Sequence, residues 1–148
     1  MQGPAKGCTK HFFYPGFTPA TGGLLREPDL VQRRNAFEQP GRRAAWLGQH
    51  GIPWLGECLV SLFCYEPPAL PGLLLGLATG AQPIRLMVAT GRATAAVQAA
   101  INMLNGLQPS WNVRRALSIS YLPALTQRDF DHLLWACDLN YVRGEDSV

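Results

Sequence analysis

The residues with the clearest chemical potential lie together near the carboxyl end of the sequence. A short apolar run at 139–142 is followed by a mixed polar group: Arg143, Gly144, Glu145, Asp146 and Ser147. A turn does not require an arginine, carboxylates and a hydroxyl in such close succession. Arginine pairs well with phosphate, so the group favours a site for an anionic ligand. A structural ion pair between Arg143 and Glu145 or Asp146 is the alternative.

These polar residues follow a segment in which strand-like and helix-like patterns alternate. Apolar runs predict strands at 58–65, 83–89, 115–121 and 139–142. Leucine-rich, alanine-rich and amphipathic stretches predict helices at 68–79, 92–104 and 126–137, the second ending at Asn105-Gly106. Thr126 is expected to cap the last helix, with Asp129 completing a near capping box. This alternation predicts an α/β fold with a parallel, doubly wound sheet.

In such a sheet, ligands bind outside the carboxyl ends of the strands. The residues at or just after the ends of the four predicted strands are, in chain order, Phe63, Tyr65 and Glu66; Thr90, Gly91 and Arg92; residues 121–127; and residues 143–147. Aromatic rings can stack on a base, and an amide such as that of Gln127 can read its edge. Ordinary structural roles are the alternative, with Tyr65 and Phe130 as core aromatics and Gln127 as a first-turn helix residue.

Motifs and composition exclude several other classes of protein. No GxGxxG follows the first predicted strand, and no GxxxxGK[ST] occurs, which disfavours ordinary dinucleotide and P-loop sites. The chain has 148 residues, of which 47% are hydrophobic and 16% charged, as expected for a globular domain. The net charge of +3 and the scattered arginine pairs do not favour nucleic acid as a partner.

Prolines and glycines interrupt the longest uncharged run, at 67–84, so no membrane helix is expected. The cysteines lack CxxC spacing and the histidines lack nearby ligands, which predicts reduced thiols, no metal site and a soluble, cytoplasmic protein. Residues 1–30 are expected to be mostly irregular, with a possible strand at 12–14. A helix is predicted at 28–40 and a helical turn at 44–47.

Two long segments and one short segment resemble bacterial protein-arginine rhamnosyltransferases that modify elongation factor P. These are FFYPGFTPATGGLLRE at 12–27, LLWACDLNYVRGEDS at 133–147 and SLFCYE at 61–66. The resemblance covers essentially the whole chain, and it implies a GT-B fold, with two Rossmann-like domains facing each other across a cleft. It also implies that the chain is a fragment. Residues 1–56 would be the end of the N-terminal domain and a linker, and residues 57–148 a truncated Rossmann-like domain that binds a nucleotide sugar.

The family resemblance implies an inverting transfer of rhamnose from dTDP-β-L-rhamnose to an arginine of elongation factor P. The dTDP-sugar is a donor substrate, and no separate cofactor is implied. The family's donor-binding positions fall on Tyr65, Gln127, Phe130 and the group from Arg143 to Ser147, with Phe130 packed on the thymine. A second aromatic that packs on the thymine is expected where this chain has Ala124. That side of the base site is therefore either missing or supplied by Tyr121. Losing one stacked ring can cost ~1–3 kcal/mol of binding.

The implied chemistry is demanding because a guanidinium has a pKa above about 12. Carboxylates must therefore orient and deprotonate the acceptor, and Glu145 is expected to support this step by bracing the arginine or the substrate. Arg143 and Ser147 are expected to stabilise the leaving diphosphate. The family's catalytic aspartate lies in the N-terminal domain, so the isolated chain is expected to be inactive. The alternatives are a non-catalytic nucleotide-binding module and a degenerate gene product that does not fold.

Overall fold

The structure is a computed structural model that describes residues 14, 16, 18–19, 21–22 and 27–143. For Arg143 it describes the backbone only. The chain divides into two compact units, residues 1–33 and residues 34–148. In the first unit the Thr21 N–H donates to the Thr18 carbonyl at 3.0 Å. Residues 12 and 13 of the possible strand lie outside the described residues, and Tyr14 is in no regular element.

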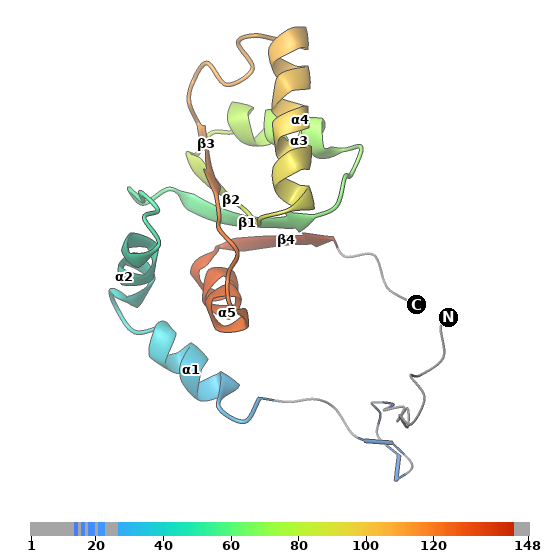
Figure 1. Cartoon of the computed structure of the whole chain (residues 1–148). Helices are drawn as coiled ribbons and strands as arrows, with labels where there is room; N and C mark the ends of the chain where they lie inside the picture. The colour runs from blue at the N-terminus through green and yellow to red at the C-terminus, as the bar shows by residue number, and fades with distance from the viewer. Residues whose placement is uncertain (1–13, 15, 17, 20, 23–26, 144–148) are drawn as a thin grey trace. The chain divides into compact units, whose positions relative to one another are not determined.

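In residues 34–148, the described residues form a parallel four-stranded sheet in the order β3-β2-β1-β4 (Figure 1). The strands are β1 (Cys58–Cys64), β2 (Ile84–Val88), β3 (Leu117–Tyr121) and β4 (Leu139–Arg143). The helices of the chain are α1 (Leu30–Phe37), α2 (Arg42–Gln49), α3 (Leu70–Thr79), α4 (Arg92–Leu107) and α5 (Gln127–Ala136). The predicted parallel α/β alternation is therefore confirmed.

Packing explains where the observed boundaries differ from the predicted ones. Helix α4 was expected to end at Asn105-Gly106, and that is wrong, because the helix continues to Leu107. Leu104 is buried, and the Trp111 indole N–H donates to the Asn105 side chain at 2.8 Å. The turn after the helix thus holds its last residues in place despite the low helix propensity of glycine. Helix α2 is longer than the predicted turn at 44–47.

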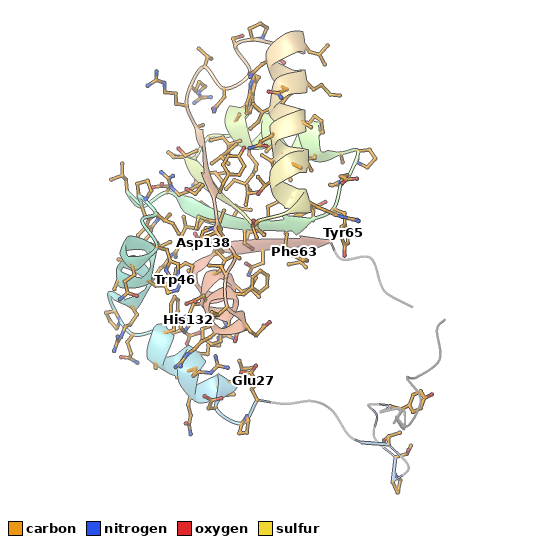
Figure 2. All side chains as sticks on the ribbon, viewed as in Figure 1. Glu27, Trp46, Phe63, Tyr65, His132 and Asp138 are labelled. Atoms are coloured by element: carbon orange, nitrogen blue, oxygen red, sulfur yellow. The ribbon has the colours of Figure 1, made fainter. Side chains whose placement is uncertain are left out.

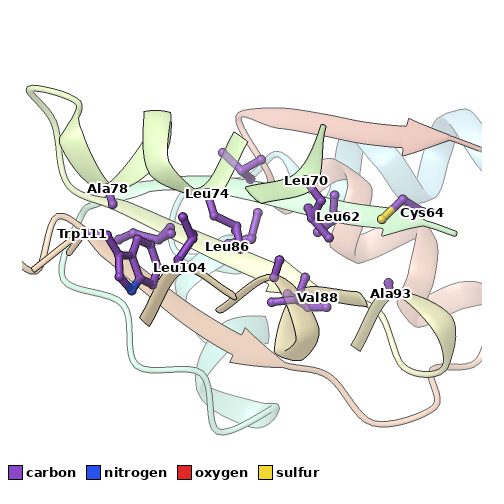
Figure 3. Packing of buried hydrophobic residues seen from close by; sticks show 14 residues of the cluster. Leu62, Cys64, Leu70, Leu74, Ala78, Leu86, Val88, Ala93, Leu104 and Trp111 are labelled. Atoms are coloured by element: carbon purple, nitrogen blue, oxygen red, sulfur yellow. The ribbon is translucent and has the colours of Figure 1, made fainter. Parts of the chain in front are cut away.

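One face of the sheet packs against α3 and α4 (Figures 1 and 3). Side chains alternate across a strand, so Leu62 of β1 and Leu86 of β2 point to the same face. They meet Leu74 of α3 and Val97 of α4 in one apolar cluster, and all of these side chains are almost fully buried.

The opposite face packs against α2 and α5. Leu59 of β1 and Met87 of β2 alternate with the residues of the first face and meet Leu47 of α2 and Leu133 of α5. The sheet is therefore covered on both sides, as the nearly continuous apolar runs predicted. No helix in the described part of the chain is long and apolar enough to cross a membrane.

The cysteines of this unit have structural positions. Cys58 and Cys64 lie on the same strand, as predicted, so they cannot bridge each other. Cys58 and Cys137 are free thiols. Burial raises the pKa of the Cys137 thiol to about 12, which makes it a poor nucleophile at neutral pH.

Asp138, the residue before β4, attaches that strand to β1. Its main-chain N–H donates to the Leu59 carbonyl at 2.8 Å, and its Oδ2 accepts the Leu59 N–H at 2.8 Å. Arg43 of α2 donates to both carboxylate oxygens, at 2.9 and 2.7 Å. The Arg43 guanidinium also lies 4.7 Å from the centroid of the Trp54 ring. One carboxylate therefore joins β1, β4 and α2.

Replacing Asp138 by alanine is expected to destabilise the fold by about 1–3 kcal/mol, because the N–H of buried Leu59 loses its side-chain acceptor. Urea denaturation measures this change. Glu38→Ala is the matched control, since it removes an exposed carboxylate paired with Arg34 and should cost under about 0.5 kcal/mol. Equal losses in the two variants would contradict the role given to Asp138.

Candidate functional site

A hollow of about 420 Å³ opens at the carboxyl edge of the sheet. The Ala89 N–H donates to the Leu62 carbonyl at 3.0 Å, and the Leu122 N–H donates to the Val88 carbonyl at 2.9 Å. The main-chain hydrogen bonding between neighbouring strands therefore continues up to this hollow. The hollow is lined by Phe63, Ala89, Thr90, Leu122, Pro123, Ala124, Leu125, Thr126, Gln127, Phe130 and Val142.

The hollow lies at the point where the strand order reverses. Strands β2 and β3 extend the sheet on one side of β1, and β4 extends it on the other. Phe63 of β1 and Val142 of β4 both line the hollow. Open α/β sheets bind ligands at such a switch point, outside the carboxyl ends of the strands. The hollow therefore lies at the edge of the sheet where the sequence placed its candidate ligand-binding residues.

Two aromatic rings form one part of the hollow. Phe63 and Phe130 of α5 have centroids 5.8 Å apart and planes inclined at 75°. Phe63 alternates with Leu62, which points to the α3/α4 face, so Phe63 points toward α5. Its side chain is 41% exposed, which leaves ring surface for a ligand. Figure 2 labels Phe63 and Tyr65 at this end of β1.

Sequence reasoning placed Phe63 at a strand end but did not include it among the site residues. The expected second aromatic position, Ala124, does line the hollow. Tyr121 is not among the lining residues, because it shares a strand face with Leu117 and Ile119, which pack in the α3/α4 cluster. The structure therefore places Phe63, and not Tyr121, beside Phe130. Strand alternation shows that Phe63 and Leu62 lie on opposite faces of the sheet, and packing determines which of the two faces meets α5.

The first turn of α5 forms the polar wall. Thr126 caps the helix as predicted, since its Oγ1 accepts the Asp129 N–H at 3.1 Å and donates to Asp129 Oδ2 at 2.7 Å. His50 Nε2 lies 3.8 Å from Asp129 Oδ1. Gln127 begins the helix, and its Nε2 donates to Asp131 Oδ1 at 3.2 Å. Capping thus fixes the turn that presents Gln127 to the hollow.

Tyr65 lies at the same edge of the sheet but is not among the lining residues. Its ring instead contacts the Arg92 guanidinium, 5.0 Å from the ring centroid, at the start of α4. Arg143 ends β4 opposite Cys64, and its side chain lies outside the described residues. The rest of the predicted polar group also lies outside them: Gly144, Glu145, Asp146 and Ser147.

The aromatic surface of the hollow could accept a planar ring. The lining residues that the structure describes include one amide and two hydroxyls, those of Thr90 and Thr126, but no carboxylate, imidazole or cation. A larger hollow, of about 600 Å³, includes Glu57 and Arg85 in its lining but lies at the amino ends of the strands, opposite the usual ligand edge. Across the described part of the chain, no group of three or more His, Cys, Asp or Glu could hold a metal ion.

The strand order and the hollow define a Rossmann-like α/β unit with a hollow at its switch point. Residues 1–148 match the family model described as "EarP: Elongation-Factor P (EF-P) rhamnosyltransferase EarP". The chain belongs to this family, which confirms the resemblance carried by the three sequence segments.

Curated relatives and a solved structure agree with this placement. The chain is 45% identical to the protein-arginine rhamnosyltransferase of Pseudomonas aeruginosa and 46% identical to that of Pseudomonas putida, covering 97% and 95% of this chain. A structure described as "Structural basis for EarP-mediated arginine glycosylation of translation elongation factor EF-P" has a TM-score of 0.68 and 42% identity over 92% of this chain. The chain spans 39% and 38% of the two relatives and 45% of the solved chain.

Acid is expected to weaken this fold through Asp129 and Asp138. The Thr126 hydrogen bond is the main cause that lowers the pKa of Asp129, and the Arg43 hydrogen bond is the main cause for Asp138. A lowered folded-state pKa gives stability that is complete above the unfolded pKa of about 3.9 and is lost as pH falls through the folded value.

Urea denaturation between pH 7 and pH 3 measures this loss. The free energy of unfolding should stay nearly constant down to about pH 5 and then fall. The Asp129→Asn variant should lose less stability on acidification, because one of the two carboxylates is gone. Identical acid dependence in the variant and the parent chain would contradict the assignment to Asp129.

Proposed function

We propose that this chain is the donor-binding part of a protein-arginine rhamnosyltransferase. In this proposal it binds dTDP-β-L-rhamnose for inverting transfer of rhamnose to an arginine of elongation factor P, in the cytoplasm where translation occurs. The observation that carries the proposal is the hollow of two aromatics and one amide at the β1/β4 switch point, in a chain of the elongation factor P rhamnosyltransferase family.

The hollow suits the base of the donor. Its volume of about 420 Å³ falls within the usual range for small-molecule pockets. Phe63 and Phe130 offer apolar surface for a pyrimidine ring, and Gln127 offers a hydrogen-bonding edge. Base–aromatic stacking contributes ~1–3 kcal/mol per base, so this pair can supply a substantial part of the binding energy.

The donor diphosphate is assigned to the residues that follow β4. Val142 lines the hollow, so the chain passes from the base site directly into the polar group that begins with Arg143. Arg143 and Ser147 would stabilise the negative charge that develops on the leaving diphosphate. Gly144 and Asp146 are assigned to donor binding with them, and Tyr65, which follows the neighbouring strand β1, would also contact the donor.

Deprotonation of the acceptor guanidinium needs a further group, because none of the lining residues that the structure describes is titratable. Glu145 would support that step, and the general base would come from the N-terminal domain of the two-domain GT-B enzyme. Under this proposal residues 1–56 end that N-terminal domain and form the linker, and residues 57–148 belong to the nucleotide-sugar-binding domain.

The Phe63→Ala and Phe130→Ala variants are each expected to weaken dTDP binding by about 1–3 kcal/mol, or roughly 5- to 150-fold, because a stacking surface is lost. Isothermal titration calorimetry measures the change. Tyr121→Ala is the control, since Tyr121 lies on the opposite strand face and should leave the affinity within about twofold. A folded parent chain that shows no affinity for dTDP would overturn the proposed donor site.

The Ala124→Phe variant is expected to bind dTDP more tightly, by up to about 1–3 kcal/mol. It adds a third ring to a lining position that now carries only a methyl group. The same titration measures the gain, and Ala124→Leu controls for added apolar bulk without an aromatic face. Weaker binding by the phenylalanine variant would show that the hollow has no room for a third ring.

Transfer itself distinguishes an enzyme part from a non-catalytic nucleotide-binding module. The isolated chain is expected to leave elongation factor P unmodified when dTDP-β-L-rhamnose is supplied. Adding the N-terminal domain of the Pseudomonas putida relative should restore rhamnosylation, detected by mass spectrometry of the acceptor arginine. Binding of dTDP without restored transfer would favour the binding module.

A further inference from the structure

Asp131 contacts Gln127, whose side-chain amide lines the hollow. Gln127 and Asp131 are four positions apart on α5, so they share a face of that helix. Gln127 Nε2 donates to Asp131 Oδ1 at 3.2 Å. Phe130, which forms part of the aromatic wall, lies between them in sequence and on the same side of the helix. Asp131 is therefore adjacent to the hollow without lining it.

This contact determines which way the Gln127 amide points. An ionised carboxylate only accepts hydrogen bonds, so the group that faces Asp131 must be the amide NH₂ and not the amide oxygen. Rotating the amide by half a turn would place two oxygens against each other. Oε1 and the second N–H of Gln127 thus remain available to a ligand as a fixed pair, one acceptor beside one donor.

We propose that Asp131 is a specificity-determining positioning residue that makes the hollow selective for the imide edge of a pyrimidine base. Thymine and uracil present a ring N–H beside a carbonyl, which matches an acceptor beside a donor. Cytosine presents a ring nitrogen acceptor beside an amino donor, which matches only the reversed amide. This inference rests on the proposed binding of dTDP and adds the residue that sets the choice of base.

An exposed glutamine–aspartate pair on a helix can also act simply as a local helix contact. In that case removing the carboxylate would change stability and leave the relative affinities for different bases untouched. Base selectivity is therefore the property that separates the two roles. The nucleotides dUDP and dCDP suit this comparison, because they have the same charge and differ only at the edge that Gln127 would contact.

The test measures the affinities of the parent chain and of Asp131→Asn for dTDP, dUDP and dCDP by calorimetry. The parent chain is expected to bind dTDP and to prefer dUDP over dCDP by about tenfold or more. In Asp131→Asn the neutral amide can donate or accept, so Gln127 can reverse and the preference should fall to about threefold or less. Any general effect of the lost charge cancels in the ratio.

Two further variants complete the experiment. Glu38→Gln removes a carboxylate from an exposed pair elsewhere and should keep the full preference. Gln127→Ala should abolish the preference, and adding Asp131→Asn to it should change nothing more, since Asp131 acts through Gln127. Asp131→Ser, also neutral and able to donate or accept, replaces Asp131→Asn if that variant does not fold.

The outcomes separate this inference from the function on which it rests. Failure of the folded parent chain to bind dTDP overturns both. If the parent chain binds dTDP, either of two results overturns the role of Asp131 alone: equal affinity for dUDP and dCDP, or a preference that survives in Asp131→Asn. A preference lost in Asp131→Asn and kept in Glu38→Gln supports it.

Discussion

The attachment of β4 to β1 through Asp138 is the interaction on which the site depends. A parallel sheet offers a ligand crevice only where its strand order reverses, and here the reversal exists because β4 lies next to β1. Asp138 accepts the Leu59 N–H and is held by the two terminal guanidinium nitrogens of Arg43. A charge pair at the opposite end of the strands thus helps to create the hollow at their carboxyl ends.

Successive side chains along a strand point to opposite faces of the sheet, and this alternation decides which of them reach the hollow. Phe63 and Leu62 are neighbours in sequence, yet one lines the hollow and the other lies in the α3/α4 core. The same rule keeps Tyr121 away from the hollow, although it lies at the same edge of the sheet. Neighbouring strand residues therefore divide between the core and the hollow.

This rule also explains how far the sequence alone could lead. Alternating apolar runs predicted the parallel fold, and Thr126 with Asp129 correctly predicted the start of α5, which places Gln127 and Phe130. The sequence did not identify Phe63 as the ring beside Phe130, because that requires knowing which strand face meets α5. It also missed the contact between Tyr65 and Arg92, which depends on the relative placement of two strand ends. Local patterns specify elements, whereas facing residues depend on packing.

The position of Phe63 on a strand has a kinetic consequence. A ring carried at residue 124 would belong to segment 122–126, which lies outside the strands and helices. Phe63 belongs to a strand hydrogen-bonded to neighbours on both sides, so its backbone is already in place. Under the proposed function, a nucleotide would enter or leave beside Phe63 without a loop having to order or open at that ring, so the entropic cost there would be small.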